Sequence, residues 1–213
     1  MSGDASLKQD FLDGKDIHTA TAARVWGVDP GDVSVEQRRR AKMINFGLLY
    51  GMEAFGLADR LGISREEARE HIDTYFAQFH KVKEYMASVV TAARNQGYTT
   101  TLFGRRRYLP ELKSDNFRIR QMGERMALNA PVQGTAADII KAAMIELDAT
   151  LRSEKLASTL LLQVHDELIL EVPDDEKVVA EKLVVETMEG VAGLDVPLVV
   201  DIGWGPDLAS VKK

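Results

Sequence analysis

The sequence predicts an α+β fold that is mostly helical and carries one small antiparallel sheet. Apolar residues recur at helical spacing through most of the chain. The runs LLLQV and ELILEV are separated only by His165 and Asp166, which predicts a β-hairpin over about 159–172. With 213 residues and 45% hydrophobic composition, the chain is long enough for one large domain or two small lobes.

Helices are expected in order over the first half of the chain. Two short ones cover residues 4–14 and 16–26. The turn Asp29-Pro30-Gly31 precedes Ser34, which forms a capping box with Gln37 and starts the central helix, 34–51. Three more follow, at 53–61, from Ser64 to about 79, and at about 81–96. This half of the chain is therefore expected to be helical throughout.

The second half mixes strands with helices. The β-branched run 99–103 predicts a strand, and a polar helix follows over about 115–129. A further long helix is expected to begin after Pro131, followed by the hairpin. A helix at 174–190 and a strand at 197–202 complete the series. The sheet is thus expected near the C-terminal end.

Composition excludes several classes of protein. The chain has no cysteine, so it contains neither disulfides nor thiolate metal sites. No run of eighteen apolar residues occurs, and the N-terminal MSGDASLKQD lacks the basic and apolar regions of a secretory signal. We therefore expect no membrane span and a cytoplasmic location.

The net charge of -6 is distributed unevenly along the chain. Residues 1–145 carry 21 Lys and Arg against 18 Asp and Glu, whereas residues 146–213 carry 6 against 15. The basic residues gather at 38–42 and 105–107. Because binding depends on local potential, a net negative chain can still bind nucleic acid, and the acidic second part suits a magnesium site.

The central helix carries the pattern that the rest of the chain is organised around. Arg38, Lys42, Phe46 and Tyr50 recur every four residues, so they line one slowly turning helical face. Two cations followed by two rings suit a nucleoside triphosphate, whose phosphates and base need charge and aromatic surface. The alternative is a solvated basic helix whose rings face the core.

Two further groups of polar residues are candidates for contacts with DNA. Arg105, Arg106 and Arg107 cannot all face a core, so at least one points outward, either in a solvated turn or onto phosphates. Arg125 and Asn129 share a helical face with Gln133 beyond them; these donors are surface residues or contact minor-groove acceptors.

The tip of the predicted hairpin is the candidate metal site. His165-Asp166-Glu167 exposes two carboxylates on a rigid element, which is a favourable arrangement for Mg²⁺. The alternative is that the aspartate only stabilises the turn.

Four stretches resemble one known family in the same order. RRRAKMINFGLLYG resembles motif B of the family A DNA polymerases, and GYTTTLFGRRRYLPEL, ERMALNAPVQGTAADIIKAAM and LLLQVHDELILEVP match the same family. The resemblance covers almost the whole chain. It implies a helical fingers lobe at residues 1–97 and part of a palm at 98–213.

The resemblance also implies roles for individual residues. The deoxynucleoside triphosphate would contact the fingers, with catalytic assistance from Lys42, at His18, Arg38, Lys42, Phe46 and Tyr50. Primer-template DNA would lie along Arg105, Arg106, Arg107, Arg125, Asn129 and Gln133, with Gln163 and His165 near the primer end. Asp166 would bind metal, with Glu167 as the auxiliary carboxylate, in a site for two Mg²⁺ ions.

The implied reaction is template-dependent nucleotidyl transfer in DNA replication and repair, in the cytoplasm and associated with the nucleoid. The family's second metal-binding aspartate lies in motif A, and no similar stretch occurs in residues 1–213. We therefore expect a C-terminal fragment that is inactive alone. The alternatives are one half of a split polymerase, a non-catalytic nucleic-acid-binding module, or a helical interaction domain, which would not explain the hairpin.

Overall fold

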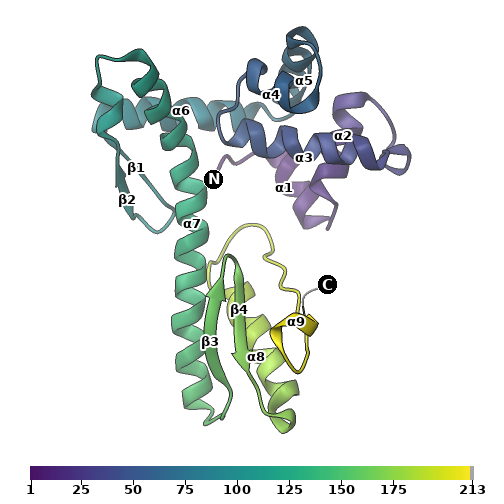
Figure 1. Ribbon diagram of the computed structural model, residues 1–213, viewed down its shortest axis with the longest axis vertical. Helices are drawn as coiled ribbons and strands as arrows, with labels where there is room; N and C mark the ends of the chain where they lie inside the picture. Colours follow the sequence, from purple (N-terminus) through teal and green to yellow (C-terminus); the bar gives the residue numbers. More distant parts are fainter. Residues whose placement is uncertain (212–213) are drawn as a thin grey trace. The chain divides into compact units, whose positions relative to one another are not determined.

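The computed structural model describes residues 1–211 and divides the chain into two compact units, Met1–Thr135 and the residues from Ala136 onward. Helix α7, Phe117–Ser153, begins in the first unit and ends in the second (Figure 1). The α+β class predicted from the sequence is confirmed. The predicted division into lobes at residues 97 and 98 stays a prediction.

The first unit is helical apart from one small sheet (Figure 1). Its elements are α1 Ala5–Leu12, α2 Ile17–Trp26, η1 Pro30–Asp32, α3 Val35–Leu49, α4 Ala54–Leu61, α5 Arg65–Gln78, α6 His80–Gln96, β1 Tyr98–Thr100, β2 Arg106–Tyr108 and η2 Pro110–Lys113. Strands β1 and β2 pair antiparallel, with Thr99 opposite Arg107.

The second unit combines the end of α7 with a hairpin and further helices. Its other elements are β3 Thr159–Val164, β4 Glu167–Glu171, η3 Asp174–Glu176, α8 Lys177–Gly190 and α9 Leu208–Val211. The predicted hairpin is confirmed: β3 and β4 pair antiparallel, Val164 lies opposite Glu167, and an irregularity falls between Leu160 and Leu162. Leu168 and Leu170 pack against a core of Leu147, Leu151 and Val184.

Helix α3 has the predicted start. Ser34 accepts a bond from the Gln37 amide, and the Gln37 side chain accepts one from the Ser34 amide, which completes a capping box. The same reciprocal pair forms between Ser64 and Glu67 at the start of α5. These local signals fix where two helices of the first unit begin.

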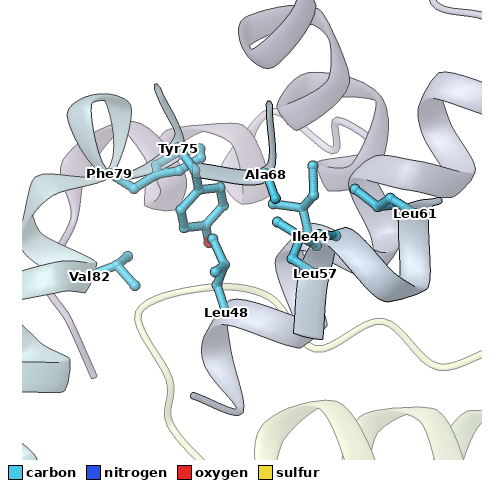
Figure 2. Packing of buried hydrophobic residues seen from close by; sticks show 9 residues of the cluster. Ile44, Leu48, Leu57, Leu61, Ala68, Tyr75, Phe79 and Val82 are labelled. Atoms are coloured by element: carbon cyan, nitrogen blue, oxygen red, sulfur yellow. The ribbon is translucent and has the colours of Figure 1, made fainter. Parts of the chain in front are cut away.

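The main core of the first unit lies beneath α3. Ile44 and Leu48 on α3 pack with Leu57 of α4, with Tyr75 of α5 and with Phe79 directly after α5 (Figure 2). Burying an isoleucine or leucine side chain stabilises a fold by roughly 1.5–3 kcal/mol. The packing therefore fixes which face of α3 points away from the core.

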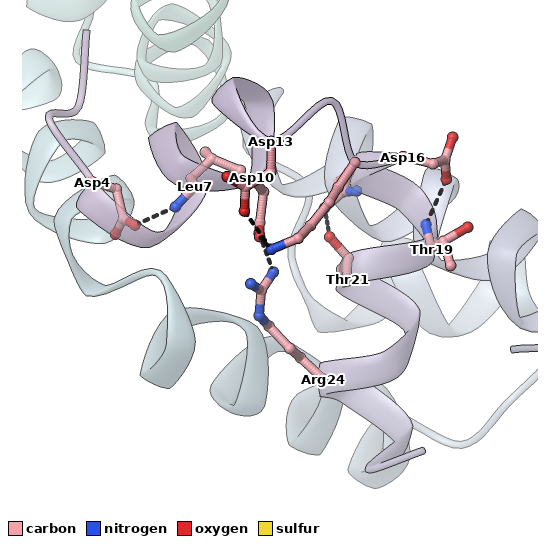
Figure 3. A network of polar contacts seen from close by, with 10 residues as sticks. Asp4, Leu7, Asp10, Asp13, Asp16, Thr19, Thr21 and Arg24 are labelled. Carbon is pink, nitrogen blue, oxygen red and sulfur yellow. Dashed lines mark hydrogen bonds and ion pairs between the residues drawn. The ribbon is translucent and has the colours of Figure 1, made fainter. Parts of the chain in front are cut away.

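A buried ion pair links the first two helices. Arg24 of α2 approaches the carboxylate of Asp10, which is almost fully buried on α1, and Lys15 also contacts it (Figure 3). Burial acts to raise the pKa of Asp10, but the two cations outweigh it and hold that pKa below its ordinary value. The pair anchors α1 to α2.

Three expectations about secondary structure were wrong: those for residues 115–153, for 99–103 and for 197–202. Residues 117–153 form one helix instead of two, because packing of Ala127 and Ala143 on either side of Pro131 outweighs the hydrogen bond that proline removes. The strand expected at 99–103 covers only Tyr98–Thr100, and Leu102 and Phe103 are exposed in the turn that follows.

The strand expected at 197–202 does not form. A strand needs a neighbour to pair with, and in the described part of the chain the pairs are β1 with β2 and β3 with β4. The Val200 amide instead donates to the Glu189 carboxylate at 3.0 Å. Among the described residues, no helix is long and apolar enough to cross a membrane.

Candidate functional site

The face of α3 opposite the core carries the predicted nucleotide-binding residues. Arg38, Lys42 and Phe46 are exposed on it, and Tyr50 is exposed at the C-cap position directly after the helix. The rings of Phe46 and Tyr50 are nearly parallel, at 22°, with centroids 6.3 Å apart. The alternative in which the rings face the core is therefore wrong.

His18 joins this face from α2. Asp16 caps α2 by accepting a bond from the Thr19 amide at 2.7 Å, and this places His18 in the first turn (Figure 3). The His18 ring lies 5.5 Å from the Phe46 ring, between centroids. The structure thus brings together His18, Arg38, Lys42, Phe46 and Tyr50, which we call the α2–α3 face.

The electrostatics of His18 keep its ring neutral. Burial is the largest cause that lowers its pKa below 6.5, and the positive charges of Arg38 and Lys42 act in the same direction. The carboxylate of Asp16 opposes them but does not cancel them. A neutral imidazole can donate one hydrogen bond and accept another.

Arg38 is held by a partner that the sequence reasoning missed. Its guanidinium donates two bonds to the carboxylate of Asp16, from Nε at 3.1 Å and from Nη2 at 2.8 Å. Arg38 is the main cause that holds the pKa of Asp16 far below its ordinary value. The only sequence signal for Asp16 was its position as a helix N-cap, which does not indicate a partner 22 residues away.

The candidate DNA-binding arginines line a small cleft in the first unit. Arg105, Arg106 and Arg107 share it with the threonines of β1 and with Gln133 and Gly134 of α7. The structure therefore groups Gln133 with the three arginines, although they are more than 25 positions apart. All three arginines are exposed.

The three arginines differ in what they contact. Arg105 donates to the Gly134 carbonyl at 2.9 Å, and Arg106 lies over the Tyr98 ring at 4.7 Å. A Cβ atom at Gly134 would lie 2.6 Å from the Thr101 Cγ2 atom, so only glycine allows this close approach of the β1–β2 turn to α7. The cleft is thus fixed by contacts at Arg105 and Gly134.

Arg125 and Asn129 lie on α7 before Gln133, and Gly51 approaches the helix near Arg125. Gly51 follows Tyr50 with φ +73°, and a Cβ atom there would lie 3.1 Å from Leu128 and 3.3 Å from the Arg125 side chain. Arg125 is exposed and Asn129 is half-buried. The chain just after α3 therefore packs close to Arg125, one of the predicted template-contacting residues, within the same unit.

The hairpin tip in the second unit carries the candidate metal ligands. His165, Asp166 and Glu167 are all exposed, and the Gln163 side-chain amide donates to the His165 carbonyl. His165 has φ +54°, a left-handed backbone conformation that residues other than glycine adopt at a cost in free energy. This strained residue directly precedes Asp166.

The donor chemistry of the tip fits magnesium. Asp166 and Glu167 offer the hard carboxylate oxygens that Mg²⁺ prefers, and Mg²⁺ often takes only one or two protein carboxylates. In the part of the chain that the structure describes, no group of three or more His, Asp or Glu side chains forms a metal cluster.

The chain is similar to known proteins over almost its whole length. The family model for DNA polymerase family A matches residues 1–210. DNA polymerase I of Mycobacterium tuberculosis strain H37Rv is 51% identical over 96% of this chain and 23% of its own length. DNA polymerase I of Geobacillus stearothermophilus is 52% identical over 100% of this chain and 24% of its own length. The chain thus spans about a quarter of these relatives.

A solved structure is also similar. It is the POL domain of Pol1 from M. smegmatis in complex with DNA primer-template and dNTP. This chain matches it with a TM-score of 0.93 at 50% identity, covering 96% of this chain and 36% of that one.

Proposed function

The chain belongs to DNA polymerase family A, and we propose that it supplies the nucleotide-binding face and one metal-binding tip of a DNA-directed DNA polymerase. The substrates would be a deoxynucleoside triphosphate and primer-template DNA. The primer 3′-hydroxyl would attack the α-phosphorus, and pyrophosphate would leave. The polymerase would act in DNA replication and repair, in the cytoplasm and in association with the nucleoid.

The grouping of cations and rings on the α2–α3 face carries this proposal. Arg38 and Lys42 hold positive charge for the triphosphate, while Phe46 and Tyr50 offer ring surface for the sugar and base. Lys42 would stabilise negative charge that develops on the phosphates during transfer. The buried side of α3 keeps these residues in fixed register.

The arginine cleft would hold the duplex without reading its sequence. Contacts from Arg105, Arg106 and Arg107 to phosphates would fix the position of the duplex. Gln133 would meet minor-groove acceptors that are nearly the same in every base pair. Arg125 and Asn129 would lie near the template and the forming pair, and Gln163 and His165 near the primer end. A copying enzyme requires this indifference to sequence.

Asp166 and Glu167 would hold Mg²⁺ at the hairpin tip. Mg²⁺ held there would lower the pKa of the primer 3′-hydroxyl and would neutralise negative charge on the phosphates. The positive φ of His165 is a backbone conformation directly before Asp166 that costs free energy, as is common at functional sites.

The test places this chain in a working polymerase. It replaces the corresponding segment of Geobacillus stearothermophilus DNA polymerase I, which is 52% identical. In this chimaera Lys42→Ala should raise the KM for the nucleotide and lower kcat, by at least about tenfold in kcat/KM. The control is Arg39→Ala, on the same helix but paired with Glu36 at 2.7 Å. Equal effects of the two substitutions would refute the proposal.

A second candidate function is a nucleic-acid-binding module without catalysis, which the arginine cleft favours. We propose that the 213-residue polypeptide tested by itself binds DNA weakly and extends no primer. Two Mg²⁺ ions need the motif A aspartate of the family in addition to Asp166. Adding a separate polypeptide that carries motif A should restore extension if the two parts form a split enzyme. Magnesium-dependent extension by the purified chain alone would contradict this.

A further inference from the structure

A buried polar side chain lies on the core side of α3, directly before Phe46. Asn45 is 6% exposed between the apolar residues Ile44 and Leu48. Burying an amide is costly unless it forms hydrogen bonds. An apolar residue would pack here without that cost, so the contacts of Asn45 require an explanation.

Asn45 connects two residues of α2. Its Oδ1 accepts a bond from the hydroxyl of Thr21, which is 1% exposed, at 3.1 Å. Its Nδ2 lies 3.0 Å from Nδ1 of His18. The two bonds form a chain from a buried threonine to the edge of the α2–α3 face.

The chain of bonds determines which nitrogen of His18 carries the proton. With the Thr21 hydroxyl donating to the amide oxygen, the Asn45 amide nitrogen faces His18 and donates. Nδ1 of His18 must then accept, so the proton is on Nε2. The opposite arrangement, with a proton on Nδ1, requires the buried amide to turn over and donate to Thr21.

We propose that Asn45, oriented by Thr21, is a positioning residue that holds His18 as the neutral Nε2–H form for donation to a phosphate oxygen of the nucleotide. This rests on the proposed function of the α2–α3 face. A neutral donor adds direction to the binding of a triphosphate, whereas the nearby cations add charge.

The charges around His18 act consistently with this role. Arg38 and Lys42 disfavour an imidazolium, burial disfavours it more, and Asp16 alone favours it. Protonation would therefore have to overcome burial and two cations and also turn the Asn45 amide. His18 should remain neutral through the neutral pH range, where nucleotide is bound.

The first experiment measures the tautomer directly and requires no enzymatic activity. Nitrogen-15 histidine labelling of the 213-residue chain, with His18→Gln for assignment, should show His18 protonated at Nε2 with a pKa below 6.5. Thr21→Val keeps the shape of the side chain but removes the hydroxyl, so a mixture of tautomers should appear. Thr21→Ser should restore the single form.

The second variant reverses the electrostatics. Asn45→Asp places a carboxylate against Nδ1, so the pKa of His18 should rise relative to that of the unsubstituted chain. The matched controls are Thr91→Val and Asn95→Asp, at exposed positions on α6, and they should change neither the tautomer nor the pKa. Circular dichroism shows whether each variant is folded. A single Nε2–H form in Thr21→Val would overturn the inference, as would an unchanged pKa in folded Asn45→Asp.

The final readout links the tautomer to the nucleotide. In the chimaeric polymerase, Thr21→Val should raise the KM for the nucleotide about twofold to tenfold, the range of one weakened hydrogen bond, with a smaller change in kcat. If the tautomer changes but the KM does not, the positioning role is wrong. If Lys42→Ala also leaves kcat/KM unchanged, the proposed function itself fails, so the two failures are distinguishable.

Discussion

The α2–α3 face and the hairpin tip carry the two halves of the proposed chemistry, and they are built in different ways. On the α2–α3 face the polar groups have partners within the chain: Arg38 is paired with Asp16, and His18 is bonded to Asn45. At the tip, Asp166 and Glu167 are exposed carboxylates beside a strained residue, His165. The first region is held by side chains and the second by backbone geometry.

This difference shows what each region can tolerate. A site held by several side-chain bonds over a packed core keeps part of its function when one bond is removed, because one hydrogen bond contributes only about 0.5–1.5 kcal/mol. A tip that offers two carboxylates loses its chemistry when one of them is removed. The substitutions below test this contrast, from the largest expected effect to the smallest.

The core beneath α3 should give the largest effect. Ile44→Ala removes a fully buried side chain and should lower the free energy of unfolding by about 2–5 kcal/mol. Urea unfolding followed by the fluorescence of Trp26, which packs against this core, measures the change. The control Ile145→Ala, at a position 72% exposed, should cost less than about 1 kcal/mol. Equal costs would show that the α2–α3 face does not rest on this core.

The hairpin tip should give the largest effect on activity. Asp166→Asn removes a charged ligand and should lower primer extension by the chimaeric polymerase at least about 100-fold. Asp175→Asn, an exposed acid in the same unit, is the control and should leave activity unchanged. Retention of more than a tenth of the activity by Asp166→Asn would mean that the tip is not the metal site.

The ring of Phe46 provides a test of selectivity. Phe46→Tyr adds a hydroxyl at an exposed position of the α2–α3 face, where it can replace the sugar hydroxyl that a dideoxynucleotide lacks. Incorporation of dideoxynucleotides relative to normal nucleotides should rise about twofold to tenfold. Competition assays with the chimaera measure the ratio, and an unchanged ratio would remove Phe46 from the sugar pocket.

The Asp16–Arg38 pair should behave as a competitor of the triphosphate. Asp16→Asn keeps an N-cap for α2 but releases Arg38, so the KM for the nucleotide should fall about two- to fivefold. Steady-state kinetics of the chimaera test this. A raised KM would instead show that Asp16 holds Arg38 in the conformation that binds phosphate.

The same pair predicts a pH dependence of stability. Because the folded chain lowers the pKa of Asp16, its stabilising effect is complete above the ordinary value of 3.8 and is lost as the pH falls below it. The difference in unfolding free energy between the wild type and Asp16→Asn should therefore shrink from pH 6 to pH 2. A difference that is constant over this range would contradict the ion pair.

The hairpin tip should show the smallest change in stability. His165→Gly relieves the positive φ and should raise the free energy of unfolding by about 1 kcal/mol or less, since glycine adopts this conformation without a penalty. Thermal unfolding measures the shift. If His165→Gly destabilises the chain, contacts of the imidazole outweigh the strain.

The sequence predicted the features that depend on residues close together in the chain. The capping box at Ser34, the helix start at Ser64, the hairpin around His165 and Asp166, and the face of α3 follow from short-range patterns. The continuous helix through Pro131 could not be predicted, because packing along α7 outweighs the local preference of proline.

Contacts between residues far apart in the sequence could not be predicted either, because local patterns do not report them. Asn45 is bonded to residues 24 and 27 positions away, and Asp16 to one 22 positions away, and no periodicity reports such pairs. The strand expected at 197–202 does not form, because among the described residues no neighbouring strand pairs with it. The pattern of a single segment does not show whether a pairing strand lies beside it.

The most direct test of the central claim asks whether nucleotide covers the α2–α3 face. Acetylation of lysines in the chimaera bound to primer-template DNA, read by mass spectrometry, compares Lys42 with Lys83, which is also exposed. The account predicts that the correct deoxynucleoside triphosphate protects Lys42 and leaves Lys83 unchanged. Equal modification of Lys42 with and without nucleotide, at concentrations that support extension, would contradict it.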